Sequence, residues 1–203
     1  MHLILDNKPY KPLYEPKSVV KLGEIVPGQP LAEGEHVLVA FPSRKPHVSV
    51  KPEKGKKPLA VVTFWVGKKG TPTFKATEPT LIFSRPKGTY NADGADNVLL
   101  DFYLANVELG EGKFSVQATI TPPVGDVKSM TIQEWKPFGI KNLPDGETKV
   151  KLELRDKGGQ VAAGPWNSTE RTVVINRGAP GPTAVQSATT PGATPAAPAP
   201  AKP

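Results

Sequence analysis

Short runs of hydrophobic residues, separated by turn sequences, are the main pattern along the chain. The runs are rich in Val, Ile, Leu, Thr and aromatic residues, which favours β-strands over helices. The run at 148–155 alternates most clearly, because Val150, Leu152 and Leu154 share one face and charged residues occupy the other. We predict eight strands in all, at residues 35–41, 59–66, 80–84, 97–106, 113–120, 129–133, 148–155 and 171–176.

Tight turns connect these runs. Residues 91–94, 122–125, 143–146 and 156–159 each combine Gly with Asn, Asp or Pro, the residue types that favour β-turns. The turns follow one another too closely for crossover helices, and 24 prolines with 19 glycines also disfavour long helices. The sequence therefore predicts an all-β protein, built as an immunoglobulin-like antiparallel β-sandwich.

Composition divides the chain into three parts. Residues 1–34 are interrupted by prolines, and we expect an irregular N-terminal arm packed on the sandwich. Residues 35–177 contain all eight predicted strands and form the sandwich. Residues 178–203 are a Pro/Ala-rich tail, in which 15 of 26 residues are Ala or Pro. Such a segment buries too little apolar surface to fold, so we predict that it is disordered.

Residues 143–159 (LPDGETKVKLELRDKGG) resemble the turn, strand and turn that close many bacterial immunoglobulin-like and fibronectin-like modules. Residues 40–44, 99–106, 135–138 and 164–172 also resemble segments of uncharacterised bacterial cell-envelope proteins, secreted or of lipoprotein type. Together these pieces cover roughly residues 1–177. The resemblance implies a β-sandwich in the periplasm or cell envelope. It implies no catalytic residue.

No stretch approaches the roughly 18 apolar residues of a transmembrane helix. The first residues, MHLILDNKPYKP, lack the basic start and long apolar region of a signal peptide. A start site placed downstream of a removed leader would give the same appearance. The expected location is therefore extracytoplasmic, and a cytoplasmic one stays an alternative.

The net charge of +7 comes from one segment, because residues 42–69 contain eight basic residues against the single acid Glu53. We expect this proline-rich basic loop to project its lysines and to contact an anionic partner, either a protein or an envelope polymer. Alternatively, the lysines only keep a hydrophobic edge strand soluble. Nucleic acid is disfavoured, since no aromatic residue lies between 42 and 58. The candidate binding residues are Arg44, Lys45, Lys51, Lys54, Lys56, Lys57, Lys68 and Lys69.

Catalytic signatures are missing from the sequence. The chain has no cysteine, and it contains neither a G-x-S-x-G elbow nor a glycine-rich phosphate loop. His2, His36 and His47 do not have metal-ligand spacing, so we expect no metal, no cofactor and no enzyme activity. Whether the three histidines converge in space stays open. Neighbouring positive charge predicts a lowered pKa for His47.

The tryptophans offer a second kind of binding site. Trp65 lies in a continuous apolar run and is expected in the core, whereas Trp135 and Trp166 lie beside prolines and are candidates for stacking on a sugar. Asp101, close in sequence to two other aspartates, is expected to help close a turn. The sequence thus predicts a non-catalytic cell-envelope binding or structural module. A carbohydrate-binding module and a small hydrolase are the alternatives.

Overall fold

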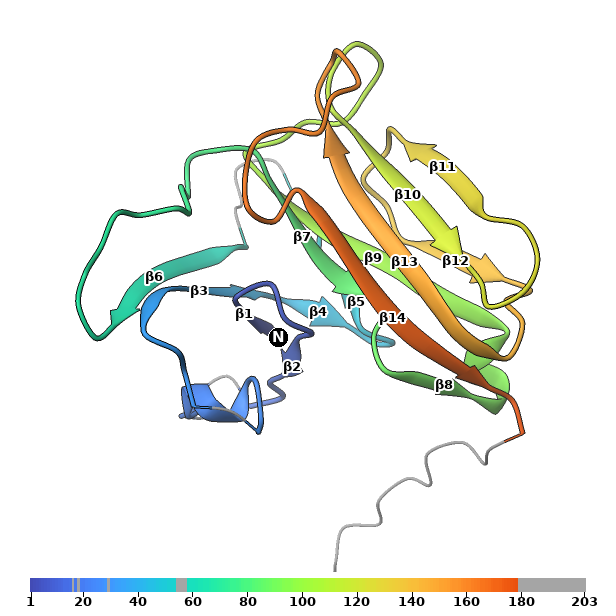
Figure 1. Cartoon of the computed structure of the whole chain (residues 1–203), viewed down its shortest axis with the longest axis horizontal. Coiled ribbons are helices and arrows are strands. Elements are labelled where there is room, and N and C mark those ends of the chain that lie inside the picture. The colour runs from blue at the N-terminus through green and yellow to red at the C-terminus, as the bar shows by residue number, and fades with distance from the viewer. Residues whose placement is uncertain (16, 18, 29, 54–57, 179–203) are drawn as a thin grey trace, which may run out of the picture.

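The computed structural model describes residues 1–15, 17, 19–28, 30–53 and 58–178. Nearly all regular structure in this part consists of strands, so the predicted all-β class is confirmed (Figure 1). Two short 3-10 helices, η1 (Leu22–Glu24) and η2 (Ala92–Ala95), are the exceptions. No helix among the described residues has the length and apolar character needed to span a membrane. The tail predicted from residue 178 onward lies, apart from its first residue, outside the described residues.

All eight predicted strands are present, with bounds that differ by three residues at most. They are β3 (Gly34–Phe41), β6 (Ala60–Val66), β7 (Thr80–Arg85), β9 (Asn97–Ala105), β10 (Ser115–Thr121), β11 (Lys128–Ile132), β13 (Gly146–Arg155) and β14 (Ser168–Asn176). The described residues contain six more strands, so the predicted number was too low. These are β1 (His2–Leu5), β2 (Lys11–Pro12), β4 (Ser43–Arg44), β5 (Val48–Ser49), β8 (Thr89–Asn91) and β12 (Phe138–Lys141). Each is too short to show a clear alternation.

Two sheets face each other in the C-terminal part and form what we call the sandwich. One has the order β11-β10-β13-β14-β8 and the other the order β12-β9-β7 (Figure 1). Apolar side chains from both sheets make one continuous core. Strand pairing is antiparallel except between β14 and β8, which run parallel. The fully antiparallel arrangement that we predicted is therefore wrong at this one edge.

The sandwich core follows the alternation of the sequence. On β13, Val150, Leu152 and Leu154 are fully buried, as predicted, whereas Lys149 on the opposite face is exposed and Lys151 is half-buried. Burying an aliphatic side chain of this size contributes about 1.5–3 kcal/mol. These residues are therefore a main source of the stability of this region.

The first residues of the chain join a third sheet, which we call the N-terminal sheet, with the order β2-β1-β3-β6. β1 lies between β2 and β3, and His2 pairs with Phe41. One face of this sheet packs against the sandwich through Val39 and Phe41, which contact a cluster that includes Ile82 and Tyr103. The hairpin β4–β5 follows β3 and approaches β9. The domain boundary at residue 34 stays a prediction.

Candidate functional site

The structure separates the basic residues of the predicted loop into two groups. Arg44 and Lys45 are exposed in the β4–β5 hairpin, just beyond the last residue of β3. Lys68 and Lys69 are exposed after β6, whose last residue pairs with the first residue of β3. Because a strand rises about 3.3 Å per residue, the length of β3 holds the two groups roughly 20 Å apart. Three further lysines of the loop lie outside the described residues: Lys54, Lys56 and Lys57.

Lys51 points into the protein, whereas we expected it to project into solvent. Its ammonium donates to Asp101 Oδ1 at 2.7 Å, to Ser49 Oγ at 2.7 Å and to the carbonyl oxygen of Phe102 at 2.6 Å. Burial lowers the pKa of Lys51, and the charge of Asp101 opposes this effect. Lys51 therefore connects the hairpin to β9, and it is not a group that binds an external anion.

Asp101 is the other half of this ion pair. It is fully buried in β9, and its Oδ2 accepts a hydrogen bond of 2.9 Å from the backbone N–H of Ser49. The prediction that it closes a turn is wrong. Asp101 lies on the face of β9 opposite the core residues Leu100 and Phe102, and it fixes the position of the hairpin that carries Arg44 and Lys45.

A different set of cationic side chains meets where the N-terminal sheet contacts the edge of the sandwich. Ser84 at this point is the extra residue of a β-bulge, because Phe83 and Arg85 pair with successive residues of β9. A bulge changes the direction of the side chains around it. We call the assembled group the cationic site; it consists of His2, Tyr10, His47, Arg85, Lys87 and Arg171.

His2 and Tyr10 form the buried part of the cationic site. The two rings stack with centroids 3.6 Å apart, and His2 is fully buried. His2 Nδ1 lies 3.2 Å from Ser84 Oγ, and its Nε2 lies 3.3 Å from Nδ1 of His47. Two of the three histidines therefore converge. His36 makes its hydrogen bonds elsewhere, near the start of β3.

His47 enters the cationic site from the β4–β5 hairpin. Its φ is +79°, and its N–H donates to the carbonyl oxygen of Arg44 at 2.6 Å. A positive φ is uncommon for a residue other than glycine, and such backbone strain often occurs at functional sites. The tight turn places His47, partly exposed, against the buried His2.

Arg85 and Lys87 lie over the ring of Tyr10. The ammonium of Lys87 is 4.1 Å from the ring centroid and donates to the carbonyl oxygen of Tyr10 at 2.7 Å. The guanidinium carbon of Arg85 is 5.3 Å from the same centroid, and Arg85 Nη1 lies 3.3 Å from the Tyr90 hydroxyl. The Tyr10 hydroxyl and Arg85 Nε are both buried, and no hydrogen bond of normal geometry reaches either atom in the described part of the chain. The Arg85 guanidinium nevertheless lies close to the hydroxyl and opposes the rise that burial causes in the pKa of Tyr10. A buried donor without such a hydrogen bond is costly unless a ligand or water satisfies it.

Arg171 supplies the third cation, from β14. Its guanidinium donates to the carbonyl oxygens of Ser84 at 3.3 Å, Asn7 at 3.2 Å and Lys8 at 3.3 Å, and it lies 4.5 Å from the ring centroid of Phe83. Burial lowers the pKa of Arg171 to about 10. Arg171 thus holds the β1–β2 turn against the sandwich and adds a positive charge at the base of the site.

No carboxylate neutralises this charge among the described residues, because none of Arg85, Lys87 and Arg171 forms a salt bridge there. Burial, and next the charge of His47, lower the pKa of His2 to about 3. Burial, and next Arg85 and Lys87, lower the pKa of His47. The predicted direction is thus confirmed for His47, although the neighbouring cations come from the end of β7 and the β7–β8 connection. At pH 7 both imidazoles are neutral, and the three positive charges of Arg85, Lys87 and Arg171 remain, with the Met1 ammonium near the two histidines.

Trp135 lines a groove between β6 and the end of β9. The groove has a volume of about 840 Å³ and is lined mainly by apolar side chains, including Leu59, Val61 and Tyr103. The indole N–H of Trp135 donates to the carbonyl oxygen of Phe102 at 2.9 Å, and the Tyr103 ring meets the indole edge to face at 4.9 Å. Trp135 is half-buried, so part of its ring faces the groove and the rest packs on β9.

The other two tryptophans differ from expectation. Trp166 is only 6% exposed and packs against Phe74 with centroids 5.1 Å apart. It therefore does not form an exposed platform for a sugar. Trp65, expected in the core, is half-buried on the edge strand β6.

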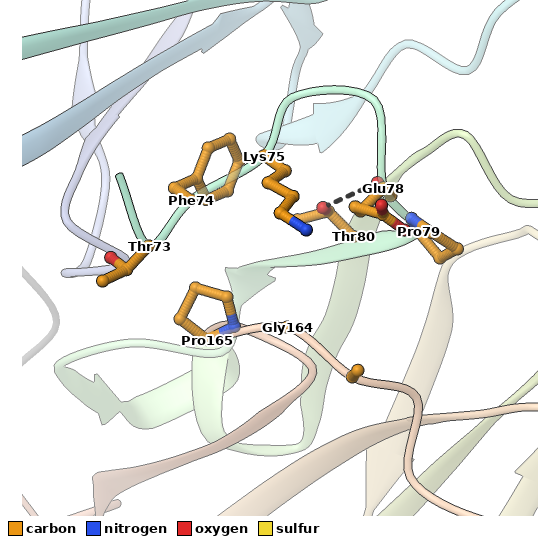
Figure 2. Close-up of a pocket in the computed structure, with 9 residues that line it drawn as sticks. Thr73, Phe74, Lys75, Glu78, Pro79, Thr80, Gly164 and Pro165 are labelled. Carbon is orange, nitrogen blue, oxygen red and sulfur yellow. Dashed lines mark hydrogen bonds between the residues drawn. The ribbon is translucent and has the colours of Figure 1, made fainter. Parts of the chain in front are cut away.

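A smaller pocket of about 270 Å³ lies next to Phe74 (Figure 2). The Thr80 hydroxyl there donates to the carbonyl oxygen of Glu78 at 3.1 Å. No histidine lines the pocket, and Glu78 is its one acidic residue, so it offers no base paired with a nucleophile. Its lining residues are Thr73, Phe74, Lys75, Glu78, Pro79, Thr80, Ala163, Gly164 and Pro165.

Metal-binding groups are not assembled in the part of the chain that the structure describes: no three His, Cys, Asp or Glu side chains are placed there to hold an ion. His2 and His47 contact each other, and the second ring nitrogen of His2 is engaged by Ser84. The chemistry of the cationic site is therefore that of hydrogen-bond donors and fixed positive charge.

No family model, curated protein or solved structure matches the chain.

Sequence reasoning missed the cationic site because its residues come from separate segments of the chain. One local signal was present in β14, where Arg171 is in phase with the buried residues Val173 and Ile175. An arginine on the inward face of a strand indicates a buried cation that needs acceptors. Arg85 and Lys87 follow the buried run of β7 without any comparable pattern.

Proposed function

We propose that this protein is a non-catalytic binding module that holds an anionic group of its partner at the cationic site. The observation that carries the proposal is the gathering of Arg85, Lys87 and Arg171 without a salt-bridge partner in the described residues. Positive charges in a partly buried site attract an anion more strongly than the same charges in water.

The parts of the site have different roles in this proposal. Arg85, Lys87 and His47 are partly exposed and form the side that a ligand reaches. The Tyr10 hydroxyl and Arg85 Nε are buried donors that no hydrogen bond of normal geometry reaches in the described residues, and an anionic oxygen would satisfy them with charge-assisted hydrogen bonds. The fully buried His2 keeps the Tyr10 ring in place through stacking. Phosphate and carboxylate groups have the charge and the acceptors that this arrangement requires.

The scaffold fits an extracytoplasmic binding module. We propose an immunoglobulin-like sandwich, since two mainly antiparallel sheets enclose one apolar core, and sandwiches of this kind commonly present binding loops at their ends. The partner in this proposal is an envelope polymer that carries phosphate or carboxylate groups. A carbohydrate-binding module, the alternative, now depends on Trp135, because Trp166 is buried.

The test uses inorganic phosphate and polyphosphate as probes, with isothermal titration calorimetry on the full chain. The site variant is Arg85→Gln/Lys87→Gln, and the matched control is Lys128→Gln/Lys157→Gln, which removes two exposed lysines from β11 and the β13–β14 turn. We expect at least about tenfold weaker binding for the site variant and a change below about twofold for the control. An equal loss in both variants would show that binding follows net charge alone and would overturn the proposal. Binding of an acidic peptide with no binding of polyphosphate would identify a protein partner instead.

A further inference from the structure

β6 is an edge strand with one unpaired side. It is the last strand of the N-terminal sheet and pairs only with β3 (Figure 1). Apart from the pairing with β3, no backbone–backbone hydrogen bond among the described residues involves residues 60–66. In an antiparallel pair every second residue directs its N–H and C=O away from the neighbouring strand. β6 therefore presents a row of free backbone donors and acceptors.

The sequence of β6 does not protect this edge. The strand, AVVTFWV, contains no charge, proline or glycine, and its pairing with β3 continues over seven residues without a bulge. Val62 on it is 54% exposed. Edge strands of soluble proteins are usually protected by charged residues, by prolines or by bulges. By contrast, the edge strand β2 has two residues, one of them Pro12.

The Trp135 groove adjoins the same strand. Leu59 and Val61 line it together with Tyr103 and Trp135, and no residue of β3 does. An added strand beside β6 would therefore place alternate side chains over or into this groove. Strand addition works in this way, because main-chain hydrogen bonds give affinity and pockets for alternate side chains give specificity.

The charge near β6 indicates the kind of partner. Lys68 and Lys69 are exposed directly after the strand, and the whole net charge of +7 lies in residues 42–69. Two copies of this chain joined along β6 would bring two such segments together, which repulsion disfavours. A segment with acidic residues beside an apolar stretch has the complementary charge.

We propose that β6 accepts an extended segment of a partner protein as an additional strand, with apolar side chains in the Trp135 groove and acidic residues beside Lys68 and Lys69. This interaction surface does not depend on the cationic site. That site lies at the Phe41 end of β3, where His2 pairs with Phe41, whereas Lys68 and Lys69 lie at the Gly34 end.

The first experiment tests charge and orientation with fluorescently labelled peptides of alternating valine and threonine. One peptide ends in aspartates and its matched control ends in lysines. Fluorescence anisotropy with the full chain is expected to show at least about tenfold tighter binding of the aspartate peptide. The variant Lys68→Glu/Lys69→Glu is expected to reverse this preference, and Arg85→Gln/Lys87→Gln to leave it unchanged. Equal binding of the two peptides, or no binding of either, would overturn the proposal.

The second experiment tests backbone pairing directly. Two versions of the aspartate peptide carry N-methyl groups on alternate residues, one on the even and one on the odd positions. Only one edge of an added strand faces β6, so we expect one version to lose binding and the other to keep it. Equal binding of both versions would contradict strand addition. A dimer of the free chain in analytical ultracentrifugation that Val62→Lys dissociates would assign the edge to a second copy and also overturn the proposal.

Discussion

The sandwich and the N-terminal sheet are held by different kinds of contact. The sandwich core consists of aliphatic and aromatic side chains supplied at every second position, such as Val150, Leu152 and Leu154 on β13. The N-terminal sheet has apolar contacts too, but buried polar groups fix its position: Lys51 with Asp101, and Arg171 with the carbonyl oxygens of the β1–β2 turn. Apolar alternation supplies stability, and the buried polar contacts determine where the two regions meet.

This difference has a consequence for function. Hydrophobic burial has no direction, whereas hydrogen bonds and ion pairs place groups within narrow limits of distance and angle. The cationic site lies where polar contacts dominate, between β1, the hairpin and β14. A site that recognises a small anion requires such fixed donors.

The largest effect is expected from Trp166→Ala, because this residue packs where the two regions meet. Removal of a buried tryptophan lowers the free energy of unfolding by about 3–5 kcal/mol. We expect hydrogen exchange to show that amides of β3 lose more protection than amides of β13. The matched variant Leu152→Ala, inside the sandwich core, should reduce protection in β13 first. The same pattern in both variants would mean that the two regions form one cooperative unit.

A slightly smaller effect is expected from Asp101→Asn, which leaves the ammonium of Lys51 without its counter-ion. Removing one of the two charged partners of a buried ion pair lowers the free energy of unfolding by about 3 kcal/mol, because the other charge stays buried without compensation. In urea denaturation, the additional change Lys51→Met should restore part of this loss, since the unpaired charge is then gone. No restoration in the double variant would show that the pair does not act as a unit.

The third prediction concerns pH and His2, whose pKa is about 3 in the folded protein against 6.5 for the unfolded chain. Above pH 6.5 both states are neutral at this residue. As the pH falls from 6.5 toward 3, the unfolded state gains a proton that the folded state does not accept. The free energy of unfolding therefore decreases by up to about 1.4 kcal/mol per pH unit. At pH 5 it is about 2 kcal/mol lower than at pH 7 on account of His2.

The variant His2→Phe removes this group and keeps a ring that can stack on Tyr10. Urea denaturation at pH 7 and pH 5 should show a smaller acid loss for the variant than for the parent protein. Parallel losses in the two proteins would assign the acid sensitivity to other groups.

The sandwich was largely predictable from the sequence, and the cationic site was not. Runs such as 148–155 show which face is buried, because strand alternation is a local pattern. The N-terminal residues gave only a short apolar run at Leu3 to Leu5, yet β1 pairs with β3 more than thirty positions later in the sequence. The contact between His2 and His47, and the position of Arg85 over Tyr10, depend on such long-range pairing. From local composition we also expected Lys51 and Trp166 on the surface. Both are instead engaged in tertiary contacts, Lys51 with Asp101 and Trp166 with Phe74, which the local sequence does not reveal.

Nuclear magnetic resonance of the arginine side chains tests the cationic site most directly. The chain has five arginines, and the Nε atoms of Arg85 and Arg155 are buried without a partner in the described residues, so Arg155 is an internal control. On titration with phosphate at constant ionic strength, we expect a saturable shift of the Arg85 Nε–H signal and no comparable shift for Arg155. An unchanged Arg85 signal at saturating phosphate, or equal shifts at all five arginines, would contradict the proposal that the cationic site holds an anionic group.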